Sequence, residues 1–201
     1  MRKSLAILTY CFAVPRVSKW SIFIPFPSKW LAGDKSVVVA SDDFYVFGIL
    51  TSSTHRLWMH AQKSTLGETT CYTHNTCFET FPFPQNCPEK IKTEIRVAMQ
   101  AIHDYRTEQM ERKQWGITQL YNQFFNESAS QLAKLHAQLD QLVYKAYGIK
   151  ANDDPLKFLL ELNFEVANRE SQGLSVVAPG LPPIVKNAQE FITEDCVRMP
   201  E

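Results

Sequence analysis

The chain has 201 residues, of which 45% are hydrophobic and 21% are charged. That length and apolar content allow one hydrophobic core and a second small one, and they exclude a chain that is disordered throughout. Lysine plus arginine equals aspartate plus glutamate at 21 each, so no whole-chain positive field indicates a nucleic-acid partner, and any contact with DNA requires a local basic patch.

The five cysteines stand at irregular spacings and include no Cys-x-x-Cys pair. An odd number without that pair argues against a complete disulfide framework and against a zinc ribbon. The group Cys71, His74, Cys77 and Cys87 also matches no standard ligand spacing. We therefore expect no metal site and a reducing, cytoplasmic location.

The N-terminal segment has two interpretations. Basic residues before the apolar run 5–14 imitate a secretory signal, but no small-residue cleavage site precedes Pro15. The same run is rich in β-forming residues and stops at the proline, which favours a buried strand leading into a second strand at 20–24. No apolar run reaches the roughly 18 residues of a membrane-spanning helix, so we expect no membrane contact.

Turn residues then precede a β-branched strand at 36–40, so residues 1–42 form a β-rich unit. Asp42 or Asp43 can cap a single long helix from about 43 to 62, because apolar residues recur there at three- and four-residue steps. The expected apolar face consists of Phe44, Phe47, Leu50, Thr54, Leu57, Trp58 and Ala61, and the expected polar face of Ser52, Ser53, Arg56, His60 and Lys63.

After Pro84 the pattern becomes helical. An apolar stripe from Ile91 runs towards Met110. A short helix capped by Thr118 follows, and a longer one that starts at Ser128 or Ser130 ends at Gly148. The pair Asp154 and Pro155 opens a last helix, in the order expected of a helix start. The predicted fold class is thus α+β.

Two pieces between Asp43 and Pro84 form a long ordered pattern. The first is DFYVFGILTSSTHRLWMHAQ, and the second is Tyr72-Thr73 followed by FETFPFP. Together they resemble the target recognition region of single-chain type IIG restriction-modification enzymes and their adenine-N6 DNA methyltransferase relatives. The matching residues are Phe47, Gly48, Ile49, Leu50, Ser52, Ser53, His55, Trp58, Tyr72, Thr73, Phe78, Thr80, Phe81, Pro82, Phe83 and Pro84.

The helical half carries a second motif of the same family. This motif is an LY-rich turn followed by L-x-x-LH-x-x-LD-x-x-V-x-x-AYG. It corresponds to Leu120, Tyr121, Leu132, Leu135, His136, Leu139, Asp140, Val143, Ala146, Tyr147 and Gly148. The resemblance covers roughly residues 10–165. It implies a target-recognition-like subdomain over 1–86 and a helical C-terminal subdomain over 87–170. The composition after Ser171 turns to Ser, Gly and Pro, which predicts a linker or loose tail over 171–201.

Catalytic motifs of that family are absent from the sequence. An adenine-N6 methyltransferase needs a glycine-rich loop for S-adenosylmethionine and an (N/D)PP(Y/F) turn for the flipped base, yet the chain has seven glycines and neither motif. We also find no nuclease core. The resemblance therefore implies no catalytic residue and no cofactor in this chain, with S-adenosylmethionine belonging to an N-terminal catalytic portion.

The resemblance implies two partners: double-stranded DNA and a methyltransferase catalytic domain or subunit. Arg16 and Lys19 lie in a Pro-Arg-Val-Ser-Lys segment that matches a P-R-(V/I)-S-K segment of the family. Lys29 and Lys35 continue this basic segment, in which Trp20 and Trp30 stand between the cations, and the helix adds Arg56 and Lys63. The candidate DNA-binding residues are Arg16, Lys19, Ser52, Ser53, His55, Arg56, Tyr72 and Thr73.

Alternative roles remain for the chain and for two of its motifs. The chain as a whole is alternatively a truncated remnant whose helices only brace a partner subunit, or a secreted helical protein. His136 and Asp140 stand one helical turn apart, but with no nucleophile nearby we expect a packing role rather than a catalytic pair. The rings of FPFP can stack on bases, but we expect them to pack the recognition unit against the helices.

Overall fold

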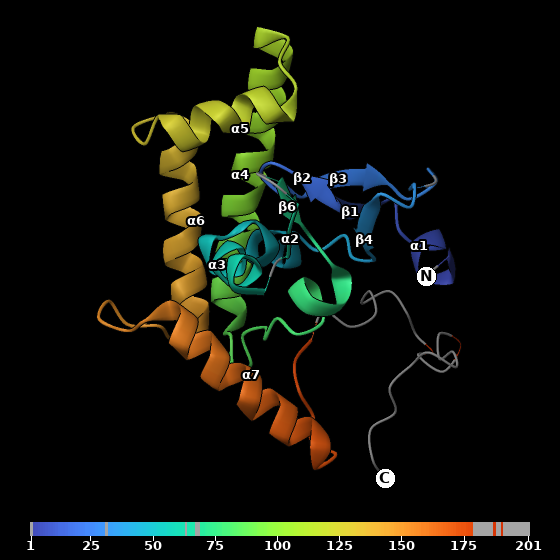
Figure 1. Ribbon diagram of the computed structural model, residues 1–201, viewed down its shortest axis with the longest axis vertical. Helices are drawn as coiled ribbons and strands as arrows, with labels where there is room; N and C mark the ends of the chain where they lie inside the picture. Colours follow the sequence, from blue (N-terminus) through green and yellow to red (C-terminus); the bar gives the residue numbers. More distant parts are fainter. Residues whose placement is uncertain are drawn as a thin grey trace.

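The computed structural model describes residues 2–30, 32–62, 64–66, 69–178, 187 and 190. Its architecture is α+β, which confirms the predicted class: two small antiparallel sheets lie beside a set of helices. Figure 1 shows the strands on one side of the long helices α4 and α6, with α5 across one end of these helices and α7 at the other. None of the described helices has the length and apolar character needed to cross a bilayer.

The first sheet is built around the predicted N-terminal strand. After a short helix α1 (Arg2–Ala6), β1 (Tyr10–Pro15) pairs with β3 (Ile24–Pro27) and with β4 (Ser36–Val39). Alternate side chains of β1 and β4 are buried on the face towards the helices, namely Phe12, Val14, Val37 and Val39.

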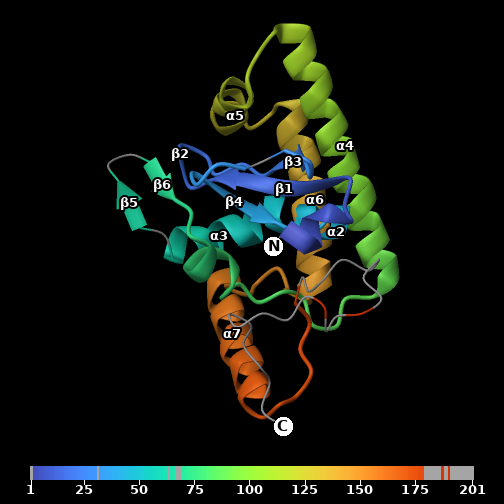
Figure 2. The ribbon, with the colours of Figure 1, turned by 90° about the vertical axis from the view of Figure 1, so that its right-hand side faces the viewer.

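The strand expected at 20–24 starts only at Ile24. Ser21 has a left-handed backbone with φ of 46°, which a regular strand does not accommodate. Residues 19–23 instead form a loop between β2 (Val17–Ser18) and β3. The second sheet has the order β2, β6 (Thr69–Cys71) and β5 (Ser64–Leu66), and Figure 2 shows it beside α3.

The helix expected from about 43 to 62 is two helices, α2 (Phe44–Thr51) and α3 (Ser53–Gln62). The break lies at Ser52, whose backbone is extended with ψ of 160°. Its hydroxyl donates to the Ile49 carbonyl at 2.7 Å and accepts from the His55 amide at 3.4 Å. One serine thus satisfies the end of α2 and the start of α3.

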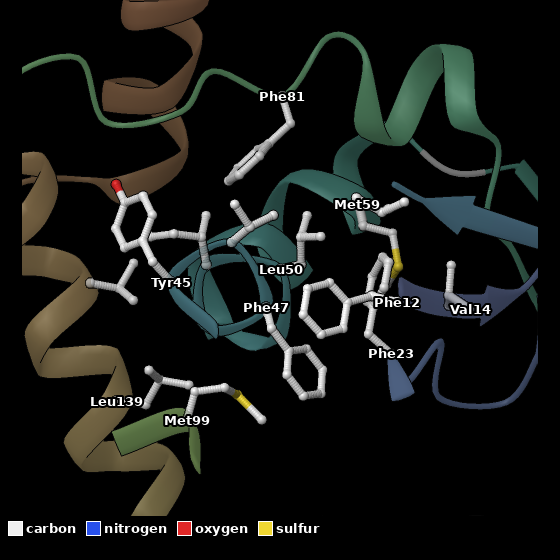
Figure 3. Packing of buried hydrophobic residues seen from close by; sticks show 14 of the residues in the cluster. Phe12, Val14, Phe23, Tyr45, Phe47, Leu50, Met59, Phe81, Met99 and Leu139 are labelled. Carbon is white, nitrogen blue, oxygen red and sulfur yellow. The ribbon is translucent and has the colours of Figure 1, made fainter. Parts of the chain in front are cut away.

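Helix α2 is buried on all sides, from Tyr45 through Leu50. In Figure 3 its side chains radiate from the coil, with Phe12 on one side and Met99 and Leu139 on another. The approach to α4 is close at Gly48, since a Cβ built there would lie 2.6 Å from Ile95 Cγ2. The expectation of one apolar and one polar face therefore fails for α2, because strands and helices cover it together.

The C-terminal half contains the predicted helices with shifted ends. A π-helical turn, η1 (His74–Phe78), precedes α4 (Glu89–Lys113), α5 (Ile117–Asn126), α6 (Gln131–Tyr147) and α7 (Pro155–Ser171). Helix α5 begins after Gly116 rather than at Thr118. Ser130 and Asp154 cap α6 and α7 through their side chains, and Gly148 ends α6 with φ of 76°.

A single hydrophobic cluster runs from the strands through α2 into α4 and α6. This cluster includes residues from both sides of residue 86. The predicted division into subdomains there stays a prediction. The segment after α7 folds back, because Val177 exchanges hydrogen bonds of 2.9 and 3.0 Å with the Gln85 side chain. The greater part of the tail expected at 171–201 lies outside the described residues.

Candidate nucleic-acid interface

Arg16 lies where the two sheets meet. Its amide donates to the Lys35 carbonyl and its carbonyl accepts from the Tyr72 amide, both at 2.8 Å. The exposed side chain reaches the Asp34 carbonyl at 3.5 Å. The backbone is therefore held from both sides while the guanidinium stays at the surface.

Lys19 and Trp20 are held by α5. Asn122 Oδ1 accepts from Lys19 Nζ at 3.1 Å and from Trp20 Nε1 at 2.9 Å. The Trp20 ring stacks on Phe125 with 4.1 Å between ring centroids, and the lysine ammonium lies 4.7 Å from the centroid of the Trp20 ring. The loop between β2 and β3 is thus bound to a helix about a hundred residues away in sequence.

Arg56 joins the same group of side chains from α3. Its guanidinium lies 5.4 Å from the centroid of the Phe125 ring. The cations Lys19 and Arg56 therefore gather around the Trp20–Phe125 pair, forming a surface that is both positive and aromatic. Both cations were predicted from the sequence, whereas Asn122 and Phe125 were not, since their only signal was an amphipathic helix with two phenylalanines near its end.

Three candidate residues are buried, since Ser52 and Tyr72 are 0% exposed and His55 is 2% exposed. His55 Nδ1 lies 3.0 Å from the Leu50 carbonyl, and the Tyr72 hydroxyl lies 3.2 Å from His55 Nε2. Burial lowers the pKa of His55 to about 4 and raises the pKa of Tyr72. The imidazole is therefore neutral, with Nδ1 facing the Leu50 carbonyl and Nε2 facing the Tyr72 hydroxyl and, at 3.3 Å, the Cys77 carbonyl. Ser52, His55 and Tyr72 thus support the site from inside.

Ser53 and Thr73 are half-buried and lie at helix starts. The Ser53 amide donates to Asp140 Oδ1 at 2.7 Å, which ties α3 to α6. Thr73 precedes η1, and its hydroxyl shares a hydrogen bond with the Thr76 hydroxyl. Of the eight candidates, Arg16 and Lys19 are exposed and Ser53, Arg56 and Thr73 are partly accessible. Lys63, a further basic residue of the sequence, lies outside the described residues.

The motifs with alternative roles have internal partners. His136 Nε2 accepts from the Tyr121 hydroxyl at 2.9 Å, whereas Asp140 is bound to Ser53 instead. Phe81 and Phe83 are buried, and the Tyr147 hydroxyl donates to the Pro82 carbonyl at 2.8 Å. The FPFP run thus packs against the helices and presents neither phenylalanine ring for base stacking.

Comparisons with known proteins agree with the motifs. The family model for the target recognition domain of MmeI matches residues 8–85. DNA methyltransferase A of Bacillus subtilis strain 168 is 31% identical over 169 residues, which cover 80% of this chain and 18% of that protein.

The solved structure of the type IIL restriction-modification enzyme MmeI in complex with DNA is similar in fold, with a TM-score of 0.65 at 21% identity, and covers 80% of this chain and 22% of that chain. The chain thus spans about a fifth of the length of these two proteins. The resemblance expected from the first sequence motif is confirmed, because residues 8–85 match the family model for the MmeI target recognition domain.

Proposed function

We propose that this chain selects the DNA target sequence for a site-specific DNA methyltransferase or restriction-modification enzyme of the adenine-N6, type IIG class. The observation that carries the proposal is the match of residues 8–85 to a family of target recognition domains. In this proposal, methyl transfer from S-adenosylmethionine is performed by a methyltransferase catalytic domain or subunit that works with this chain.

The accessible candidates suit the two tasks of sequence recognition. Cationic side chains on phosphates set the position of a protein on the duplex, and side chains at base edges in the major groove read the sequence. Arg16, Lys19 and Arg56 supply local positive charge on a chain whose formal net charge is +0. Ser53, at the start of α3, and Thr73, between β6 and η1, offer short polar side chains. The buried His55 and Tyr72 keep α3 and the segment after β6 in place.

The proposal is tested by fusing the chain to the catalytic half of a related methyltransferase with a different target. We expect the fusion to methylate a new site, because target choice would follow the recognition part. If the fusion folds and methylates only the original site, the chain braces the catalytic half without reading DNA. That outcome would overturn the proposal in favour of the structural alternative.

The same fusion tests Arg16 and Lys19, the two candidate cations that are exposed. If Arg16 and Lys19 contact phosphates, neutralising either one weakens binding almost equally for cognate and unrelated duplexes. The salt slope, which is the slope of log affinity against log salt concentration, then decreases in magnitude by about one. If one of them reads a guanine edge, its loss costs about 1 to 3 kcal/mol on the cognate duplex and relaxes one base position. Unchanged affinity, slope and specificity in both variants would shift the interface towards Arg56.

A further inference from the structure

A small cavity lies at the junction of the β2–β3 loop with five helices. Its volume is about 20 Å³, which is room for a single occupant of about the size of a water molecule. The wall includes residues from the loop, from α2 and α3, and from α4, α5 and α6. The polar side chains in this wall belong to Ser21, Thr51, His55, Arg56, Arg106, Tyr121 and His136.

Arg106 places a full positive charge in this wall. Its residue is 3% exposed, and its two terminal nitrogens donate to the Phe23 carbonyl, at 3.3 Å, and to the Tyr121 hydroxyl. Its Nε has no partner. Among the described residues, none of the ion pairs includes this guanidinium. The rings of Phe47 and Tyr121, 5.9 and 5.0 Å away, compensate the charge only partly.

His136 adds a second unpaired donor. The Tyr121 hydroxyl accepts from Arg106 and so gives its own hydrogen to His136 Nε2, at 2.9 Å. Burial and the two arginines lower the pKa of His136, and the neutral ring therefore carries its hydrogen on Nδ1, which has no partner. The hydroxyls of Ser21 and Thr51 are likewise buried without partners. Four residues of the cavity wall thus offer unused hydrogen-bonding groups.

We propose that this cavity binds a chloride-sized monovalent anion, held by Arg106 together with His136, Ser21 and Thr51. A water molecule would accept hydrogen bonds from these groups but would leave the buried charge uncompensated, and burying an unpaired charge costs several kcal/mol. An anion accepts the same hydrogen bonds and neutralises the charge. Because the space suits one water-sized occupant, a small monovalent anion fits it better than sulfate or phosphate does. The anion joins the β2–β3 loop to α2, α4 and α6, independently of any role in DNA recognition.

Bromide identifies the site directly. Crystals of the full chain grown in sodium bromide are expected to show an anomalous scattering peak within hydrogen-bond distance of Arg106 Nε, and the peak should be missing in Arg106→Met. Peaks at surface positions only would mean adventitious ions and would overturn the proposal. A water-like peak without anomalous signal in the cavity would overturn it as well.

Solution stability provides a second measurement. At equal ionic strength, replacing fluoride by chloride should raise the wild-type Tm by about 3 °C, because fluoride loses more hydration on burial. Arg112→Met removes an exposed arginine from the same helix and should keep this response, whereas Arg106→Met should abolish it. An equal halide response in wild type and Arg106→Met would contradict the proposal.

A gentler variant covers the case in which Arg106→Met does not fold. Thr51→Val combined with Ser21→Ala keeps the charge and removes two hydroxyls, and it should raise the chloride concentration at half-maximal stabilisation at least about threefold. An unchanged midpoint would overturn the assignment. If loss of Arg106 instead lowers the salt slope of DNA binding while the halide response persists, the guanidinium contacts a DNA phosphate and the internal site is wrong.

Discussion

At the residue scale, polar side chains of the recognition motif divide into surface groups and internal supports. Ser52, His55 and Tyr72 were candidates for DNA contact because they are polar and belong to the motif. Each instead satisfies backbone or side-chain groups inside the protein. Buried polar groups cost free energy unless they are hydrogen-bonded, so a motif residue of this kind contributes to function by holding the exposed residues in position.

The internal role of His55 predicts a pH dependence of stability. Burial lowers its pKa from 6.5 to about 4, so the unfolded chain protonates this imidazole at a higher pH than the folded protein does. The contribution of His55 to the free energy of unfolding is therefore complete above pH 6.5. It is lost as the pH decreases from 6.5 to about 4, and the loss amounts to roughly 3 kcal/mol.

Denaturant unfolding at pH 7 and pH 4.5 tests this dependence. The stability gap between wild type and His55→Gln should shrink at the lower pH, because glutamine does not titrate. His74→Gln, at an exposed position, is the matched control and should leave the pH profile unchanged. A constant gap between wild type and His55→Gln would show that His55 is not held neutral.

Trp58 predicts a large packing loss. Trp58 is 2% exposed, and its indole Nε1 donates to Thr80 Oγ1 at 3.2 Å. Trp58→Ala should lower the free energy of unfolding by roughly 3 to 5 kcal/mol, because the ring leaves a cavity. The control Trp30→Ala removes a ring from a residue that is 65% exposed and should cost much less. A loss below about 1 kcal/mol for Trp58→Ala would contradict its burial.

At the element scale, the helix α2 shows why periodicity was a partial guide. Its apolar residues do recur at helical steps, so the helix itself was predicted correctly. The break at Ser52 was missed, because serine does not interrupt a helical pattern unless its hydroxyl has a backbone partner. The burial of the second face was also missed, since α4 and α6, which cover it, are distant from α2 in the sequence.

The contact between α2 and α4 predicts the effect of adding one methyl group. Gly48→Ala would place a Cβ 2.6 Å from Ile95 Cγ2, and the short branched isoleucine cannot move aside without disturbing the core. We expect a loss of about 1 to 3 kcal/mol in thermal or denaturant unfolding. Gly33→Ala is the matched control, since nothing lies within 4 Å of its added Cβ. Equal stability of the two variants would show that α2 and α4 separate easily.

At the scale of the whole molecule, the chain combines a family match over residues 8–85 with helices that complete its core. The helices matter to the proposed recognition surface because Lys19, Trp20 and Arg56 all contact α5. Residues of the second family motif also connect helices, since the hydrogen bond between Tyr121 and His136 joins α5 to α6. Recognition strands and helices therefore depend on each other.

The missing cofactor motif predicts the behaviour of the isolated chain. Because the sequence has no glycine-rich cofactor loop and no (N/D)PP(Y/F) turn, we expect calorimetric titration with S-adenosylmethionine to show no binding and methylation assays to show no activity. A related methyltransferase with its catalytic half is the positive control. Micromolar binding of S-adenosylmethionine by this chain would contradict the assignment of the cofactor to a catalytic partner.

The sequence by itself determined the features that depend on neighbouring residues. Asp43, Ser130, Gly148 and Asp154 begin or end helices where predicted, because capping groups act within one helical turn. The ordered motif of residues 43–84 likewise predicted a resemblance to target recognition domains, and the match of residues 8–85 to the MmeI family model confirms this resemblance.

Only the tertiary structure decided which motif residues reach the surface and which polar groups meet in the interior. Burial of His55 and Tyr72, the hold of Asn122 on Lys19, and the charge of Arg106 beside a cavity all depend on segments far apart in the chain. Such contacts follow from how the sheets and helices pack, and residue type or spacing alone does not encode that arrangement locally.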